Sequence, residues 1–177
     1  LDENFNIHLD NNIMFRWACL QGHFKLAMFL YEKGADIHAK EDEAFRWACL
    51  RGHIDVAKWL YSLGVNIHAQ SDYAFRLACD RGHFHIATWL YETGMRIHSP
   101  VNIHSKSDYA FVYACQSNNE DIILWLYNLG SCVDMLITET QKINFQNCIE
   151  KHRKNIIQIL KEENSMNNLD VNLFTVI

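Results

Sequence analysis

Residues 44–69, AFRWACLRGHIDVAKWLYSLGVNIHA, return at residues 74–99 as AFRLACDRGHFHIATWLYETGMRIHS. Looser copies begin at Met14 and Ala110. A period of about 30 residues indicates a solenoid, in which each unit is one supersecondary element that buries its apolar side only against its neighbours. Such stacks generally present a surface, so the pattern favours a binding role. The copies are marked by Phe15, Phe45, Phe75 and Phe111.

Each copy predicts a helix–turn–helix hairpin. In one copy Phe45, Ala48 and Cys49 share a helix face, and Gly52 can adopt the positive φ that ends a helix. A second apolar helical stretch follows and ends at Gly64. We expect all seven glycines to end helices, and an Asx residue three positions before each Phe to cap the first helix. These predicted caps are Asn12, Asp42, Asp72 and Asp108.

The copies resemble the ankyrin repeat. The Thr-Pro-Leu-His-x-Ala-Ala stretch of that family is matched by EAFRWAC at 43–49, its Gly-His by Gly52-His53, and its Gly-Ala-Asp-Val-Asn-Ala by GVNIHA at 64–69. The resemblance runs from about residue 11 to residue 130 and implies an all-α solenoid of ankyrin repeats. The short copies look most like the ankyrin arrays of giant DNA viruses.

The predicted loops are shorter than those of the family. The repeat is three residues shorter than the family norm of about 33, and the missing residues fall between Gln70 and Asp72. We therefore expect short loops in place of projecting β-hairpins. Arg16, Arg46 and Arg76 occupy the position of the family's loop-tying His, so we expect them to bond loop carbonyls or carboxylates.

The repeat divides the chain into seven predicted parts. Residues 1–8 resemble the tail of a preceding repeat, which suggests a piece of a longer array. Repeats follow at 9–38, 39–68, 69–104 and 105–140. Residues 141–165 fit a degenerate capping repeat, and the apolar tail at 166–177 either packs back on that cap or docks another subunit. The apolar frame of the capping repeat consists of Phe145, Cys148, Ile149, Ile156, Ile157, Ile159 and Leu160.

The third repeat contains an insertion. Six extra residues lie between His98 and Asp108, and the Ile-His step occurs twice there. Loops accept lengthening at small entropic cost. We expect the stack to continue across the insertion, with the helix from Asp108 packed on the helix from Asp72.

Composition restricts the function classes. The 177 residues carry a formal net charge of −5, which lacks the basic excess that phosphate binding needs, so nucleic acid is disfavoured. No apolar run approaches the roughly 18 residues of a membrane span, and no signal peptide opens the chain. We expect a cytoplasmic protein, in the host cytoplasm if it is viral.

The histidines and cysteines form columns with one member per repeat. Residues a whole repeat apart cannot converge on one zinc ion, so we expect no metal site and structural histidines. Cys19, Cys49, Cys79 and Cys115 recur at one core-facing position and should stay reduced. With no phosphate loop or catalytic motif, we expect no enzymatic activity, no cofactor and no small-molecule substrate.

Positions that vary between the copies suggest the binding surface. On the first helix of each unit these positions lie away from the Phe face, on the concave side, and the loops before the helices vary with them. An alternative for the column of Trp17, Trp47 and Leu77 is that it fills the gap between repeats. The predicted partner-binding residues are Trp47, Leu50, Arg51, Tyr73, Leu77, Asp80, Arg81, Tyr109, Tyr113 and Gln116.

The sequence therefore predicts a non-enzymatic module that binds a protein partner in the concave groove, with a viral protein engaging a host factor as one version. Two alternatives remain open. One is a substrate-recognition adaptor of a ubiquitin ligase, which needs an effector segment that these residues do not show. The other is a structural or assembly component of a virion, which would self-associate.

Overall fold

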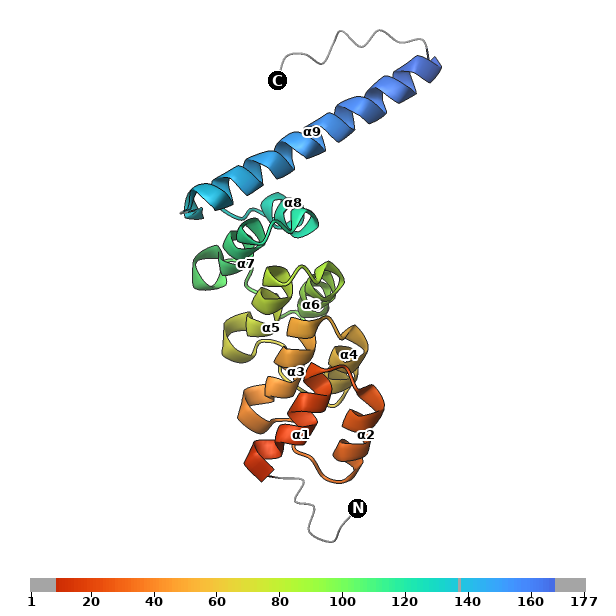
Figure 1. Ribbon diagram of the computed structural model, residues 1–177, viewed down its shortest axis with the longest axis vertical. Helices are drawn as coiled ribbons and strands as arrows, with labels where there is room; N and C mark the ends of the chain where they lie inside the picture. Colours follow the sequence, from red (N-terminus) through yellow and green to blue (C-terminus); the bar gives the residue numbers. More distant parts are fainter. Residues whose placement is uncertain (1–8, 137, 168–177) are drawn as a thin grey trace.

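The computed structural model describes residues 9–136 and 138–167. Within these ranges the chain is an all-α solenoid with no strand (Figure 1). The first helices of the four hairpins are α1 (Leu9–Leu20), α3 (Ala39–Arg51), α5 (Ala69–Asp80) and α7 (Ser105–Gln116). The second helices are α2 (Phe24–Glu32), α4 (Ile54–Ser62), α6 (Phe84–Arg96) and α8 (Glu120–Asn128). A short 3₁₀ helix η1 (Val133–Met135) and the long helix α9 (Glu139–Asn167) complete the described chain.

The first helices pack on one another along the stack, and each also packs on its own second helix. Phe45 and Cys49 of α3 are fully buried, as are Val56 and Leu60 of α4. The predicted core face is therefore correct. Burying side chains of this size contributes about 1.5–3 kcal/mol each, so neighbouring hairpins stabilise helices that are too short to be stable alone.

A tryptophan on each later second helix anchors one repeat to the preceding one. Trp59 of α4 lies 5.7 Å from the ring of Tyr31 and 6.3 Å from the ring of Phe15. Such tilted and edge-on pairs stabilise by about 0.5–1.5 kcal/mol beyond burial. The arrangement repeats for Trp89 with Phe45 and Tyr61, and for Trp125 with Phe75, Phe84 and Tyr91.

The turn glycines behave as predicted with one exception. Gly52 and Gly64 end helices with φ of 85° and 99°. Gly94 does not, because α6 runs through it to Arg96 and buries it. A Cβ at Gly94 would lie 2.8 Å from the carbonyl oxygen of Ser99. The prediction was wrong there because the inserted loop packs directly on this glycine.

The predicted Asx caps do a different job. Asp42 is the last of three consecutive residues with left-handed φ and ψ, after Lys40 and Glu41. Helix α3 has no side-chain cap, and Asp42 instead accepts bonds from the ring of His38 and from the backbone N–H of Asn66 in the next repeat. The left-handed turn replaces the loop that the short period predicted. Such residues cost about 1–2 kcal/mol each, so other contacts must hold the turn.

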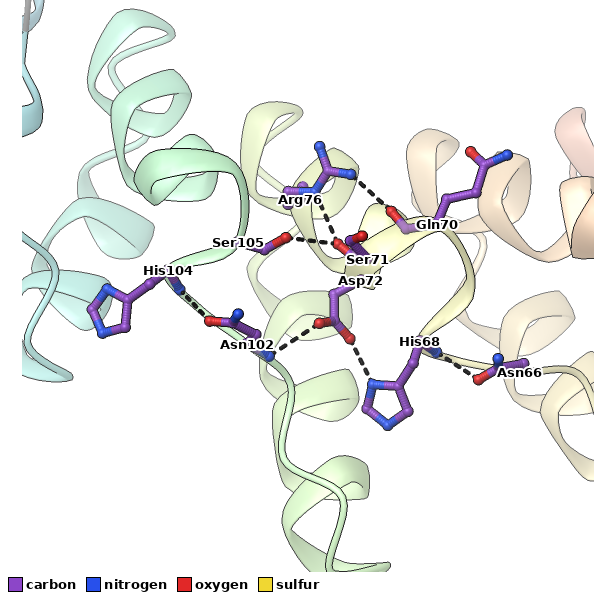
Figure 2. Close-up of polar contacts among 9 residues, drawn as sticks. All are labelled: Asn66, His68, Gln70, Ser71, Asp72, Arg76, Asn102, His104 and Ser105. Carbon is purple, nitrogen blue, oxygen red and sulfur yellow. Dashed lines mark hydrogen bonds and ion pairs between the residues drawn. The ribbon is translucent and has the colours of Figure 1, made fainter.

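The arginine column supplies those contacts, as predicted. The guanidinium of Arg46 donates to the carbonyl of Lys40 at 2.7 Å. Arg76 donates to the carbonyls of Ser71 and Gln70 at 3.2 and 3.0 Å (Figure 2). Arg16 donates to the carbonyl of Asp10 at 2.8 Å and pairs with Glu43 of the next repeat. The fourth repeat has Val112 at this position.

The stack continues across the insertion, as predicted, because α7 packs on α5. The second Ile-His step, not the first, takes the repeat's usual place. Val101 is buried, and the Nδ1 atom of His104 lies 2.6 Å from the carboxylate of Asp108. His98 is exposed with φ of 55°. The first step has instead been absorbed into the longer α6 and its exit.

The C-terminal part differs from the expected fifth repeat. The apolar frame from Phe145 to Leu160 predicted two helices, but the structure has one continuous helix, α9, which packs on α7 and α8 and then extends away from the stack (Figure 1). Phe145 and Cys148 pack on the stack, whereas Ile156, Ile157 and Ile159 are exposed. The predicted preceding-repeat tail at 1–8 and most of the apolar tail at 166–177 lie outside the described residues.

Candidate interaction groove

The ten predicted partner-binding residues come from the first helices of three successive repeats and their C-terminal ends. Because α3, α5 and α7 are stacked in order, equivalent positions form rows that cross the repeats. Arg51 and Gln116 are exposed, and the side chain of Arg81 is 60% exposed. Those of intermediate exposure are Trp47, Leu50, Tyr73, Asp80, Tyr109 and Tyr113.

Leu77 does not belong to an accessible surface. Only 8% of this residue is exposed. The gap-filling alternative therefore applies to Leu77. Trp47, at the equivalent position, keeps intermediate exposure, and Trp17 is 44% exposed.

Three aromatic rings and three buried arginines alternate along the stack in what we call the ladder. Its members are Arg16, Trp47, Arg46, Tyr73, Arg76 and Tyr109. Tyr73 lies within cation–π distance of two guanidinium groups, with the Cζ of Arg46 5.8 Å and that of Arg76 4.8 Å from the ring centroid. Arg76 also lies 5.2 Å from the ring of Tyr109. Arg16 lies 5.3 Å from the ring of Trp47. The same arginines that fasten the loops therefore hold these rings in place, which lowers the entropy that a partner would have to remove on binding.

At the end of the ladder Tyr109 and Tyr113 stack, with ring centroids 3.9 Å apart and an interplanar angle of 17°. Burial raises the pKa of Tyr109, and the neighbouring Tyr113 and Asp80 raise it further. The phenol is therefore neutral at physiological pH and available as a hydrogen-bond donor.

A small cleft lies between the second and third repeats. Its volume is about 140 Å³, and it is lined by Leu50, Arg51 and Arg81. The Nε of Arg81 lies 3.6 Å from the carboxylate of Asp80, and the hydroxyl of Ser117 donates to Asp80 at 3.4 Å. The cleft thus combines an apolar floor with two exposed guanidinium groups, one from each repeat.

The turn histidines fasten the back of this surface. The Nε2 atom of His53 lies 3.1 Å from the carbonyl oxygen of Leu20, and that of His83 lies 3.0 Å from the carbonyl of Leu50. In the fourth repeat Asn119 donates to the carbonyls of Cys79 and Asp80 instead. These contacts satisfy carbonyls at helix ends, which supports the structural interpretation of this column.

A second set of histidines ties loops to acidic residues. His68 and His104 contact Asp72 and Asp108 through Nδ1 at 2.6 Å. Asp72 joins its own repeat to the next one, since it also accepts the backbone N–H of Asn102 (Figure 2). Among the described residues no group of three or more His, Cys, Asp or Glu is placed to hold a metal ion.

The cysteine column is buried, as predicted, and its members are free cysteines. Burial raises the pKa of Cys19 to about 12, and it raises the pKa of Cys49 further. Cys148 is buried against the stack and Cys132 is half-buried. The column therefore belongs to the core and not to a reactive site.

Sequence reasoning missed a second concave region, between α8 and α9. A groove of about 590 Å³ lies there, with Tyr127, Phe145 and Ile149 among its lining residues. The sequence does hold one signal that the fifth copy lacks a turn. His152 stands where the other copies have the turn residues Gly22, Gly52, Gly82 and Asn118.

No helix in the described part of the chain is long and apolar enough to cross a membrane. Residues 15–60 and residues 45–91 match a family model for ankyrin repeats. A comparison with curated proteins found no significant match. Ankyrin repeats generally mediate protein–protein interactions. The matched stretches begin within α1 and continue into α6, and α7 with α8 continues the same stack. Residues 15–91 are therefore an ankyrin-repeat array, within an all-α ankyrin-type solenoid.

Proposed function

We propose that the chain is a non-enzymatic module that binds a protein partner along the concave face of α3, α5 and α7. The cleft of Leu50, Arg51 and Arg81 is the observation that carries this proposal. Two guanidinium groups stand exposed beside an apolar floor, and within residues 9–136 and 138–167 none of the ties between repeats uses them. Arginine and aromatic side chains are the residues that most often anchor interfaces.

The ladder supports the same proposal. Tyr73, Tyr109 and Trp47 are held by buried arginines but keep part of their surface exposed. Rings fixed before binding lose little entropy on contact. A partner that reaches from the cleft toward Tyr109 would therefore meet preorganised anchors on two successive repeats.

The free, buried thiols are what a reducing compartment maintains, so we place the module in the cytoplasm. If the chain is itself viral, as its resemblance to viral ankyrin arrays suggests, the partner is a host protein.

The test begins with affinity purification from the native host cell, using the parent chain and Arg51→Glu/Arg81→Glu as baits. A protein captured by the parent and lost with the variant is then measured by calorimetry. Loss of a hot spot costs about 2 kcal/mol or more, so we expect at least a roughly twentyfold rise in Kd. The unfolding free energy should change by less than about 0.5 kcal/mol, because both side chains are exposed.

The control is Lys58→Glu on α4, which also places a carboxylate at an exposed site. We expect it to bind as the parent does. A partner that binds the arginine variant as tightly as the parent but binds the Lys58 variant more weakly would assign the binding surface to the convex face. That result would overturn the proposal.

A further inference from the structure

Helix α9 repeats the sequence of a whole hairpin. Phe145 lies 34 residues after Phe111, and at the same spacing Ile156-Ile157 corresponds to Ile122-Ile123 and Leu160 to Leu126. The counterparts in α8 are buried core residues, exposed by 1% or less. The second half of α9 thus carries the side chains that a second helix uses to join the stack.

The turn that would bring this half back is missing. The first three hairpins turn at glycines with φ between 69° and 85°, and the fourth turns at Asn118 with φ of 55°. Gly and Asn are the residues that most readily adopt this conformation. The corresponding residue of the fifth copy is His152, and α9 passes through it as a continuous helix.

An apolar stripe is consequently left in solvent. This α9 stripe consists of Ile156, Ile157, Ile159 and Leu160, and the three isoleucines are 44%, 48% and 53% exposed. Isolated exposed apolar residues are ordinary, but a continuous set of this kind marks a contact surface.

The place where the stripe would pack is open in the same molecule. Each later second helix puts its Trp beside the Tyr of the preceding second helix, as Trp125 does with Tyr91. At the last position Phe145 partly fills the equivalent site, 5.2 Å from Tyr127 and 5.7 Å from Phe111. The α8–α9 groove of about 590 Å³ beside Tyr127, Phe145 and Ile149 remains, and Ile157 of the stripe forms part of its wall.

We propose that the chain dimerises by exchanging residues 154–161, so that the stripe of each α9 packs in the α8–α9 groove of a second copy. Both surfaces are present in every molecule and adjoin at Ile157, but a straight α9 cannot fold Ile156 and Leu160 back onto Tyr127 within one chain. Reciprocal exchange between two copies closes the interface with twofold symmetry. The partner is a second copy because the stripe has the residue spacing of α8, which residues 168–177 lack. The surfaces involved are separate from Arg51 and Arg81.

The test is the mass of the full chain by light scattering at roughly 100 µM, where an interface with micromolar Kd is mostly associated. We expect twice the 20.8 kDa of one chain. Ile156→Glu with Leu160→Glu should halve this mass, since both lie on one face of α9. The matched control is Asn155→Glu with Gln158→Glu, which adds the same charge at positions about 100–160° around the helix from Ile156 and Leu160 and should leave the dimer intact.

A second variant tests the exchange itself. His152→Gly with Arg153→His writes the Gly-His of residues 52–53 into α9. If stripe and groove are complementary, the helix turns back and the chain becomes a monomer without loss of helix. Three results would each overturn the proposal: a parent of single-chain mass, equal dissociation by the control pair, or a His152 variant that dimerises as strongly as the parent. A monomeric parent would leave the stripe to residues 168–177 or to a different protein.

Discussion

The carboxylate of Asp72 accepts a hydrogen bond from the backbone N–H of Asn102 at 3.1 Å. In the preceding interface Asp42 accepts the same bond from Asn66 at 2.9 Å. The sequence separation is 30 residues in the first pair and 24 in the second. The six-residue insertion is therefore accommodated before the tie, and Asn102, not Arg96, takes the equivalent position.

This tie predicts unequal roles for the two Ile-His steps. His104→Ala should lower the free energy of unfolding by about 0.5–1 kcal/mol, because it removes a partly exposed contact to Asp108. His98→Ala should change it by less than about 0.5 kcal/mol, since His98 is exposed. Urea unfolding followed by circular dichroism measures both. Equal losses would contradict the assignment of the second step to the repeat.

The two turn glycines of one repeat should respond differently to alanine. Gly64→Ala should cost about 1–2 kcal/mol from its positive φ alone, because nothing lies within 4 Å of the new Cβ. Gly52→Ala should cost more, since its Cβ would lie 2.8 Å from the imidazole of His83. Thermal unfolding of both variants checks the order.

Combining Gly52→Ala with His83→Ala separates the two causes. If the clash adds to the backbone strain, the double variant should lose less stability than the sum of the single losses. Strictly additive losses would mean that the imidazole is not the obstacle.

His83 should make stability fall in mild acid. Burial lowers its pKa below the ordinary value of 6.5, with His85, His53 and Arg81 adding to the effect against the bond to the Leu50 carbonyl. The unfolded chain therefore binds more protons, so the free energy of unfolding falls as pH drops through about 6.5. His83→Asn keeps a donor for the carbonyl, as Asn119 does in the next repeat. It should lose less stability than the parent between about pH 7.5 and pH 5.5, and an unchanged pH dependence would contradict this assignment.

One thiol should react quickly in the folded chain. Cys132 is half-buried, whereas the other five cysteines are buried, and a buried thiol rarely ionises. A chromogenic disulfide reagent should therefore label one equivalent rapidly under native conditions and the rest only on unfolding. Cys132→Ser should abolish the rapid phase. Rapid labelling of a second equivalent would show that the column opens more readily than its packing indicates.

The hairpins, the core face and the loop-tying arginines could be predicted because each depends on a residue that recurs in every copy. Phe45 and Gly52 are examples, since the spacing of apolar residues and the position of a glycine indicate the local structure without knowledge of distant contacts. The Asx caps were mispredicted because the preference of Asp for helix N-termini considers only the neighbouring residues in the sequence. Here a contact with the next repeat determines its position and places three non-glycine residues in the left-handed region.

Two other failures have physical causes. Gly94 matched the turn glycines in sequence, but the duplicated Ile-His step offered a second register, and packing of the loop on α6 selected it. Leu77 was counted among the groove residues because helix periodicity gives a direction around one helix. It does not give the degree of burial, and Leu77 is only 8% exposed. The groove residues that remain accessible are still a prediction until a partner is known.

The tryptophan anchors provide intrinsic fluorescent probes of the contacts between hairpins. Trp59, Trp89 and Trp125 each report on one contact between adjacent hairpins, and each has a tyrosine of the preceding hairpin within 5.9 Å. With Trp17 and Trp47 replaced, a chain that keeps one anchor at a time would show in its emission when that single junction parts. The order in which the junctions separate could thus be followed without any attached dye.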